Sequence, residues 1–272
     1  MYDKKINTKD PGLIILLIDQ SGSMAETYTS AKTKAKFAAD AVNVCIFEII
    51  LACSSGNAVK PRCDIVVIGY GDPIMKLLLK GTATEVDAMQ VPTDKIHYRR
   101  LSGAGWEDVV TDIKQWVTPV ANAGTPMHKA FEAAARVATA WAGAHQGSFP
   151  PIVMNITDGA PDKPERDAEA EADKLKAVST SDGKLLLFNA HIAKAGTGPE
   201  IVLPNSEPSN VDTTGQFIFR ISSVLPAEVL DVARSANFTP LPGARGCVYN
   251  AGAENLTKLI TFGGTLQTQA AQ

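Results

Sequence analysis

The stretch Leu13-Ile-Ile-Leu-Leu-Ile-Asp-Gln-Ser-Gly-Ser-Met24 decides the fold of this chain. Its first six residues are all leucine or isoleucine, a pattern typical of a central strand that is buried on both faces. The run ends at Asp19 and passes into a short polar loop that contains Ser21 and Ser23. Because open α/β sheets bind their ligands at the carboxyl ends of their strands, we expect this loop to lie at a ligand site.

Strand-like and helix-like segments alternate along the rest of the chain. We predict strands at 13–18, 63–70, 74–79, 151–157, 184–192 and 247–249, and helices at 31–53, 106–117, 126–141, 164–178, 226–237 and 254–261. This alternation predicts an α/β, Rossmann-like fold. Its central sheet is expected to be mostly parallel and six-stranded, with residues 74–79 as one antiparallel edge strand and helices on both faces.

The chain is expected to form a single domain over residues 1–272, with a core of about 11–262. Two segments, 72–120 and 194–216, are longer than such a sheet needs. Residues 194–216 are rich in glycine, proline, serine and asparagine, so we predict a long loop there. Residues 81–105 carry no clear periodicity, and the tail 267–272 is expected to fray.

Composition excludes several classes of protein. The formal net charge of −3 gives no basic surface for nucleic acid. No signal segment precedes the run 13–18, and six residues are far short of the roughly 20 that span a bilayer. The four cysteines lack zinc-like spacing and are expected to be buried as small apolar side chains: Cys45, Cys53, Cys63 and Cys247. We therefore expect a cytoplasmic protein without a membrane span.

Three predicted loops at the same sheet edge carry oxygen ligands. The first holds Asp19, Ser21 and Ser23, the second Thr125 and the third Asp158. Together they supply two carboxylates and three hydroxyls, with neither histidine nor cysteine. Such a hard-oxygen set favours Mg²⁺, with Mn²⁺ or Ca²⁺ as alternatives, over zinc.

These residues resemble the metal-ion-dependent adhesion site of the von Willebrand factor A (vWA) family in type, order and placement. Asp19-x-Ser21-x-Ser23, Thr125 and Asp158-Gly159 match its motifs. The resemblance implies that Asp19, Ser21, Ser23 and Thr125 bind the ion and that Asp158 acts directly or through water. It also implies a protein-interaction module without catalysis, in which an aspartate or glutamate of a partner protein completes the Mg²⁺ coordination.

Within that family the chain resembles a cytoplasmic bacterial branch associated with tellurium resistance and stress operons. The residues behind this resemblance are 19–24 and Ala123-Gly-Thr-Pro-Met127. Proteins of this branch are often encoded beside a protein kinase and a PP2C-type phosphatase, which the resemblance marks as candidate partners.

Simpler interpretations compete with the metal site. Thr125 before Pro126 is a good helix N-cap, and Asp158-Gly159 alone is a turn. A metal-dependent hydrolase or phosphatase needs a base, for which the sequence offers Asp72 or His128 besides the ligands. A third alternative is a structural module whose ion only stabilises the loops. No Gly-x-Ser-x-Gly elbow of a serine hydrolase is present.

Overall fold

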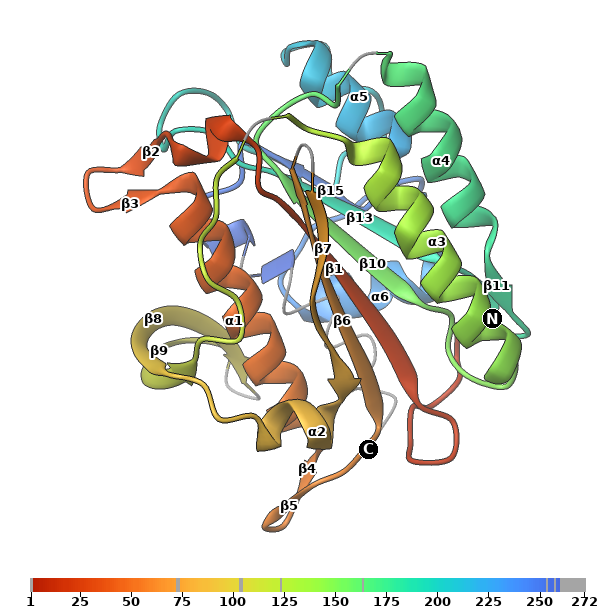
Figure 1. The fold of residues 1–272 in the computed structure, drawn as a ribbon. Coiled ribbons are helices and arrows are strands. Elements are labelled where there is room, and N and C mark those ends of the chain that lie inside the picture. Colours follow the sequence, from red (N-terminus) through yellow and green to blue (C-terminus); the bar gives the residue numbers. More distant parts are fainter. Residues whose placement is uncertain are drawn as a thin grey trace.

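The computed structural model describes residues 2–71, 74–102, 105–122, 124–162, 164–252, 254–256 and 258–259. In these residues a seven-stranded sheet forms the centre of the molecule (Figure 1). Its strands, in spatial order, are β14 (Ile201–Val202), β15 (Cys247–Tyr249), β13 (Leu186–His191), β10 (Ile152–Thr157), β1 (Gly12–Asp19), β6 (Cys63–Gly71) and β7 (Ile74–Thr82).

The predicted parallel sheet is confirmed, with one difference at its edge. β15, β13, β10, β1 and β6 run parallel, and β7 is the expected antiparallel edge strand. A seventh strand, β14, pairs antiparallel with β15, so the sheet has two antiparallel edges where the sequence predicted one. β14 was missed because two residues, Ile201 and Val202, are too short to show a period.

Within the described ranges, six helices with defined bounds lie on the two faces of the sheet (Figure 1). They are α1 (Lys34–Cys53), α2 (Ala83–Ala88), α3 (Met127–Ala144), α4 (Glu165–Ala177), α5 (Thr213–Ile221) and α6 (Ala227–Ser235). Residues 254–256 and 258–259 are also helical, in part of the predicted helix 254–261, of which the remainder lies outside the described residues, as does the tail 267–272.

The alternation of β1 divides the core in two. Ile14, Leu16 and Ile18 face a core that includes side chains of α1, α2 and α6. Residues 13, 15 and 17 face the other core, which contains apolar residues of α3, α4 and α5. Every residue of β1 is buried, which explains its unbroken apolar run.

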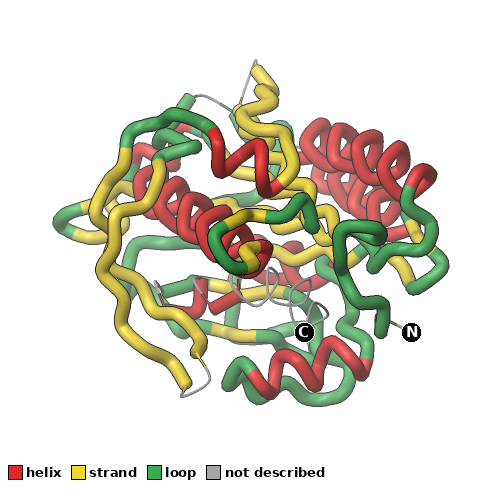
Figure 2. The backbone as a smooth tube through the Cα atoms, turned by 90° about the horizontal axis from the view of Figure 1, so that it is seen from below, coloured by secondary structure: helices red, strands yellow, loops and turns green. Residues whose placement is uncertain are grey.

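The predicted helix at 106–117 is wrong. Residues Gly105–Lys114 form strand β9, which pairs antiparallel with β8 (Thr93–Ser102). The β-branched residues Val109, Val110, Thr111 and Ile113 favour a strand. Val109 and Ile113 lie on the face of β9 that packs beside α1, whereas Val110 lies on the other face and is exposed. Ile96 and Tyr98 of β8 and Ile113 of β9 pack on Val44 of α1. The hairpin thus stands beside α1, apart from the central sheet (Figure 2).

Other corrections concern the ends of helices and the loop 194–216. α1 begins at Lys34 and not at residue 31, because residues 27–29 and 32–33 form the small hairpin β2–β3. α2 has a capping box between Thr82 and Glu85 that the prediction overlooked. The predicted loop contains β14 and the start of α5, for which Asp212 is the N-cap. Two further small hairpins are β4–β5 (54–55 and 58–59) and β11–β12 (179–180 and 183–184).

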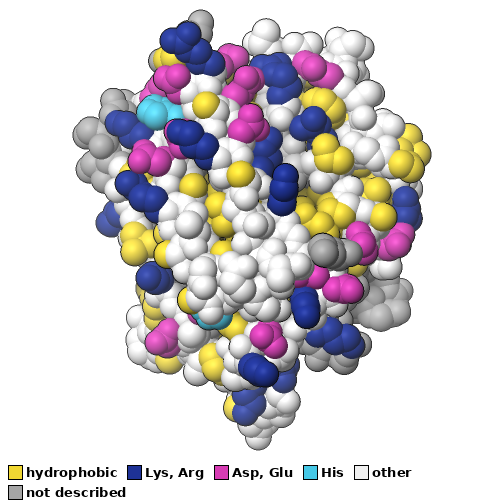
Figure 3. Space-filling model, turned by 90° about the vertical axis from the view of Figure 1, so that its right-hand side faces the viewer, with side chains coloured by type: hydrophobic (Ala, Val, Ile, Leu, Met, Phe, Trp, Pro, Cys, Tyr) yellow, Lys and Arg dark blue, Asp and Glu magenta, His cyan; other side chains and the backbone are white. Residues whose placement is uncertain are grey.

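Three features expected from the composition can be compared with the structure: the lack of a membrane-spanning helix, the burial of the cysteines and the lack of a basic patch. Among the described residues no helix is long and apolar enough to cross a membrane. All four cysteines are buried and are not joined by disulfides. On the face formed by α3 and α4, basic and acidic side chains are interspersed and do not gather into a basic patch (Figure 3).

A chain of buried hydrogen bonds crosses the middle of the sheet. The Tyr70 hydroxyl donates to Asn155 Oδ1 at 2.7 Å, and Asn155 Nδ2 donates to Asn189 Oδ1 at 3.0 Å. Asn189 Nδ2 in turn donates to Ser222 Oγ at 2.9 Å. Because all four residues are buried, each polar atom relies on its neighbour for a partner.

We predict that Asn155→Ala lowers the free energy of unfolding by about 3 kcal/mol, since it removes two buried hydrogen bonds, that of the Tyr70 hydroxyl and that of Asn189 Oδ1. Tyr70→Phe, which removes one hydroxyl, should cost about 1 kcal/mol. Urea denaturation of the two variants checks both values. Equal losses would contradict the idea that Asn155 links the two ends of the chain of hydrogen bonds.

Candidate metal centre

Asp19 is the last residue of β1 and is completely buried. Its Oδ1 accepts a hydrogen bond from the Ser21 amide at 2.8 Å, and its Oδ2 accepts one from the Thr157 hydroxyl at 2.6 Å. Thr157 ends β10, the neighbouring strand. The sequence analysis did not select Thr157. Its position directly before Asp158, at a strand end beside β1, was the available signal.

The Asp19 carboxylate is only partly stabilised by these contacts. Burial raises its pKa from 3.8 to about 6, although the hydrogen bonds from Thr157 and Ser21 lower it. The nearby charge of Asp158 raises the pKa further. The folded chain therefore holds a negative charge here that its own groups do not fully compensate.

Ser21, Ser23 and Asp158 form a continuous set of oxygens beside Asp19. Ser21 Oγ and Ser23 Oγ are 3.1 Å apart, and Ser23 Oγ donates to Asp158 Oδ1 at 2.8 Å. Ser21 is buried, whereas Ser23 is exposed at the surface. Four of the five predicted ligands are thus brought together by direct contacts.

Thr125 lies on an adjacent loop, and its predicted role as the N-cap of α3 is wrong. The helix starts at Met127 with Pro126 as its N-cap, and no side chain caps it. The Thr125 backbone is fixed by Asp162, whose Oδ1 accepts from the Thr125 amide at 2.9 Å. Among the described residues no hydrogen bond joins the Thr125 hydroxyl to the other four ligands.

The Thr125 loop nevertheless packs against the Asp19 loop. The Asn122 amide donates to the Gln20 carbonyl. A Cβ on Gly22 would lie 3.1 Å from the Asn122 carbonyl oxygen, so the two loops approach closely where glycine leaves room. A Cβ on Gly71 of β6 would lie 3.0 Å from the Gln20 carbonyl oxygen, so glycine also admits the loop on its other side.

Lys34 is a further member of the site that the sequence analysis missed. Its Nζ lies 2.9 Å from Asp158 Oδ2 and 2.7 Å from Glu26 Oε2, and its side chain is 8% exposed. Burial alone would lower the pKa of Lys34, but the hydrogen bonds to Glu26 and Asp158 raise it above its ordinary value. The ammonium therefore stays charged and offsets the charge of Asp158.

The oxygen set fits a small hard cation. Octahedral Mg²⁺ holds its ligands at about 2.1 Å, which places neighbouring ligand oxygens about 3.0 Å apart. The Ser21–Ser23 and Ser23–Asp158 oxygen separations of 3.1 and 2.8 Å match this spacing. In the described residues no three histidine, cysteine or acidic side chains cluster as an alternative metal site.

Only one of the two candidate bases of a hydrolase lies in the part of the chain that the structure describes. His128 is half-buried on α3, and among the described residues no hydrogen bond or ion pair joins it to the oxygen set. Asp72 lies outside the described residues.

Comparisons with protein families and with curated proteins find no match. Among solved structures, the chain is similar to the VWA domain of SpRpn10, with 12% identity, a TM-score of 0.47, and coverage of 92% of this chain and 94% of that one. The pilus adhesin SpaC of Lactobacillus rhamnosus GG shows 12% identity and a TM-score of 0.46, covering 98% of this chain and 31% of its own.

Manganese-loaded TRAP of Plasmodium vivax shows 15% identity and a TM-score of 0.36, over 66% of this chain and 57% of that one. The chain thus spans less than two thirds of SpaC and of TRAP. At such identities these likenesses concern the fold alone.

We predict that Asp19→Asn stabilises the metal-free protein at about pH 7.5 by up to about 3 kcal/mol, the free-energy equivalent of a pKa raised from 3.8 to about 6. A carboxyl whose pKa is higher in the folded state favours folding at low pH, and this contribution is lost as the pH rises through about 6. The gap between variant and wild type should therefore close near pH 4.

Urea denaturation in EDTA across this pH range measures the effect. The prediction is contradicted if the difference in free energy of unfolding between Asp19→Asn and wild type is the same at about pH 4 and about pH 7.5. It is also contradicted if the variant is less stable than wild type at about pH 7.5. Either result would show that the protein stabilises the Asp19 carboxylate more than its contacts indicate.

Proposed function

We propose that this chain is a vWA domain that binds Mg²⁺ through a metal-ion-dependent adhesion site and uses the ion to hold a partner protein. The observation that supports this most directly is the contact set of Asp19, Ser21, Ser23 and Asp158 at the carboxyl edge of the parallel sheet. Thr125 on the adjacent loop is proposed as a further ligand, and Asp158 would coordinate the ion directly or through water. Mn²⁺ and Ca²⁺ are the alternative cations.

The charges around the site favour an acidic partner. Two carboxylates, Asp19 and Asp158, would neutralise a divalent cation, but Lys34 already compensates Asp158. A bound ion would therefore keep a positive field at its open position. The chemistry that such an ion supplies is the capture of a carboxylate, and an aspartate or glutamate of the partner would complete its coordination.

The biological setting that we propose follows the resemblance of residues 19–24 and 123–127. The domain would act in the cytoplasm of a bacterium, in a tellurium-resistance or stress-response system. A protein kinase or a PP2C-type phosphatase encoded nearby is then the first partner to test.

We propose no catalytic activity for this site. A bound cation can activate water, but hydrolysis also needs a base placed to take the proton. Asp19 and Asp158 would be engaged as ligands of the ion, and Lys34 holds the second oxygen of Asp158. The remaining alternative is a structural ion that stabilises the loops without a partner.

Calorimetric titration of the EDTA-treated protein with Mg²⁺ and Mn²⁺, paired with capture of candidate partners, tests the proposal. We expect one saturable site and capture of the partner only in the presence of the ion. Asp19→Ala should abolish both, since it removes the uncompensated anionic ligand.

The matched control is Asp173→Ala on the exposed side of α4, which should behave as wild type. Cation binding by a folded Asp19→Ala variant would overturn the metal site. Binding of the ion without ion-dependent capture would favour the structural alternative, and ion-dependent turnover of a phosphoester would favour the enzyme.

Lys34 provides a second test of the charge argument. We predict that Lys34→Met tightens cation binding on the order of tenfold, because it removes a positive charge within hydrogen-bond distance of Asp158. The same change should weaken capture of an acidic partner. Lys36→Met is the control, because Lys36 lies on the same helix but pairs with Asp40 and Asp94. Unchanged or weaker cation affinity in Lys34→Met would contradict the argument.

A further inference from the structure

The Glu26 carboxylate lies at the outer end of a chain of polar contacts that begins at the candidate metal centre. Ser23 Oγ donates to Asp158 Oδ1 at 2.8 Å, and Asp158 Oδ2 lies 2.9 Å from Lys34 Nζ. Glu26 Oε2 lies 2.7 Å from the same ammonium. Lys34 thus donates to a candidate ligand of the ion and also to a carboxylate outside the oxygen set.

The backbone of Glu26 is fixed close to the oxygen set. Its amide donates to the Ser23 carbonyl at 2.9 Å, and its own carbonyl accepts from the Lys34 amide at 2.9 Å. The Glu26 side chain, by contrast, is 66% exposed, and in the described part of the chain its carboxylate pairs only with Lys34. Ser23 is exposed as well, so the two residues mark the solvent side of the site.

The two carboxylates on Lys34 differ in their access to solvent. The Asp158 side chain is 1% exposed, and the Lys34 side chain is 8% exposed while Glu26 covers it. Because the Glu26 side chain is mostly exposed, a carboxylate from outside can reach the position that it occupies. An exposed ion pair is weak, since solvent screens it, so Glu26 can give up this position to another carboxylate.

Glu26 also decides the net charge of the metal-loaded site. A divalent cation together with the Lys34 ammonium carries one positive charge more than Asp19 and Asp158 can balance. Glu26 supplies the remaining negative charge, and the hydrogen bond from Lys34 lowers the pKa of Glu26, so that it is ionised at neutral pH. An acidic side chain of a partner would be repelled by Glu26 unless it took the place of that carboxylate.

We propose that Glu26 is an internal competitor for the partner's acidic side chain, whose carboxylate replaces Glu26 on Lys34 as it completes the coordination of the ion. This inference rests on the function proposed above and adds Lys34 as a second group that receives the carboxylate. Asp158 already spans from Ser23 to Lys34 with its two oxygens, so the separation suits one carboxylate. The exchange selects a carboxylate over a neutral amide or hydroxyl, neither of which can balance the ammonium.

Titration of the Mn²⁺-loaded full chain with acetate, the simplest such carboxylate, tests the proposal. Entry of acetate displaces water from Mn²⁺ and so lowers the relaxation rate of the bulk water protons, measured at constant ionic strength. We expect Glu26→Gln, which removes the competitor, to tighten acetate binding about fivefold. Lys34→Met, which removes the second receiving group, should weaken it about fivefold. Neutral acetamide should bind all three proteins equally.

The double variant separates exchange on Lys34 from repulsion at a distance. If Glu26 competes for Lys34, Glu26→Gln should change acetate affinity by less than about twofold in the Lys34→Met background. The same gain in both backgrounds, or no gain in either, would overturn the proposal. Glu132→Gln, which removes an exposed carboxylate on α3, is the matched control and should bind acetate as wild type does.

Failure of the proposed function would give a different result. If Mn²⁺ does not bind to the wild-type chain, the metal site and the competitor are both excluded. If Mn²⁺ binds and acetate binds equally well to wild type and Glu26→Gln, the competitor alone is excluded and the metal site stands.

Discussion

The stabilisation of one buried carboxylate, Asp19, organises the edge of the sheet on which the candidate site lies. A charged group at the end of a fully buried strand must obtain its hydrogen bonds from the protein. Asp19 takes one from its own loop, through the Ser21 amide, and one from the neighbouring strand, through Thr157. These two bonds set the direction in which the chain leaves β1, and so they place Ser21 and Ser23 beside Asp158.

The negative charges of the two carboxylates in the site are balanced to different extents by the surrounding protein. Asp158 has an ammonium partner, Lys34, whereas among the described residues no basic side chain hydrogen-bonds to Asp19. Burial raises the pKa of Asp19, and the charge of Asp158 raises it further. A site that binds a cation must keep such an uncompensated charge, and stability of the metal-free fold is the expected cost. Lys34 limits that cost to one carboxylate.

The sequence predicted the features that depend on local pattern. The apolar run 13–18 gave a buried central strand, and the polar residues at the ends of β1 and β10 lie together because parallel strands end at a common edge. The helix expected at 106–117 failed because a short apolar period fits a strand as well as a helix, and the pairing with β8 decided the outcome. The partner of Lys34 was beyond sequence reasoning, since 124 residues separate it from Asp158.

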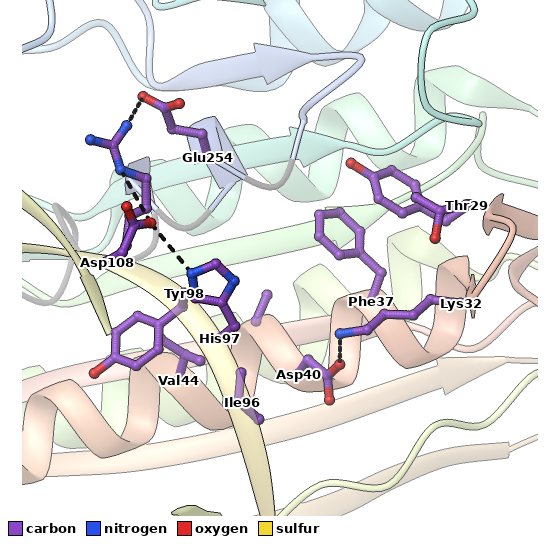
Figure 4. A pocket seen from close by; sticks show the side chains of 13 residues that line it. Thr29, Lys32, Phe37, Asp40, Val44, Ile96, His97, Tyr98, Asp108 and Glu254 are labelled. Atoms are coloured by element: carbon purple, nitrogen blue, oxygen red, sulfur yellow. Dashed lines mark hydrogen bonds and ion pairs between the residues drawn. The ribbon is translucent and has the colours of Figure 1, made fainter. Parts of the chain in front are cut away.

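Helix α1 connects the candidate metal centre with the cavity beside the β8–β9 hairpin (Figure 4). Its first residue, Lys34, contacts Asp158, and Phe37, Asp40, Ala41 and Val44 on its next turns line the cavity. The β2–β3 hairpin joins the same two regions, because it follows the loop of Ser21 and Ser23 and contributes Tyr28 to the cavity wall. The same helix therefore provides the ammonium that pairs with Asp158 and the apolar side chain Val44, on which the β8–β9 hairpin packs.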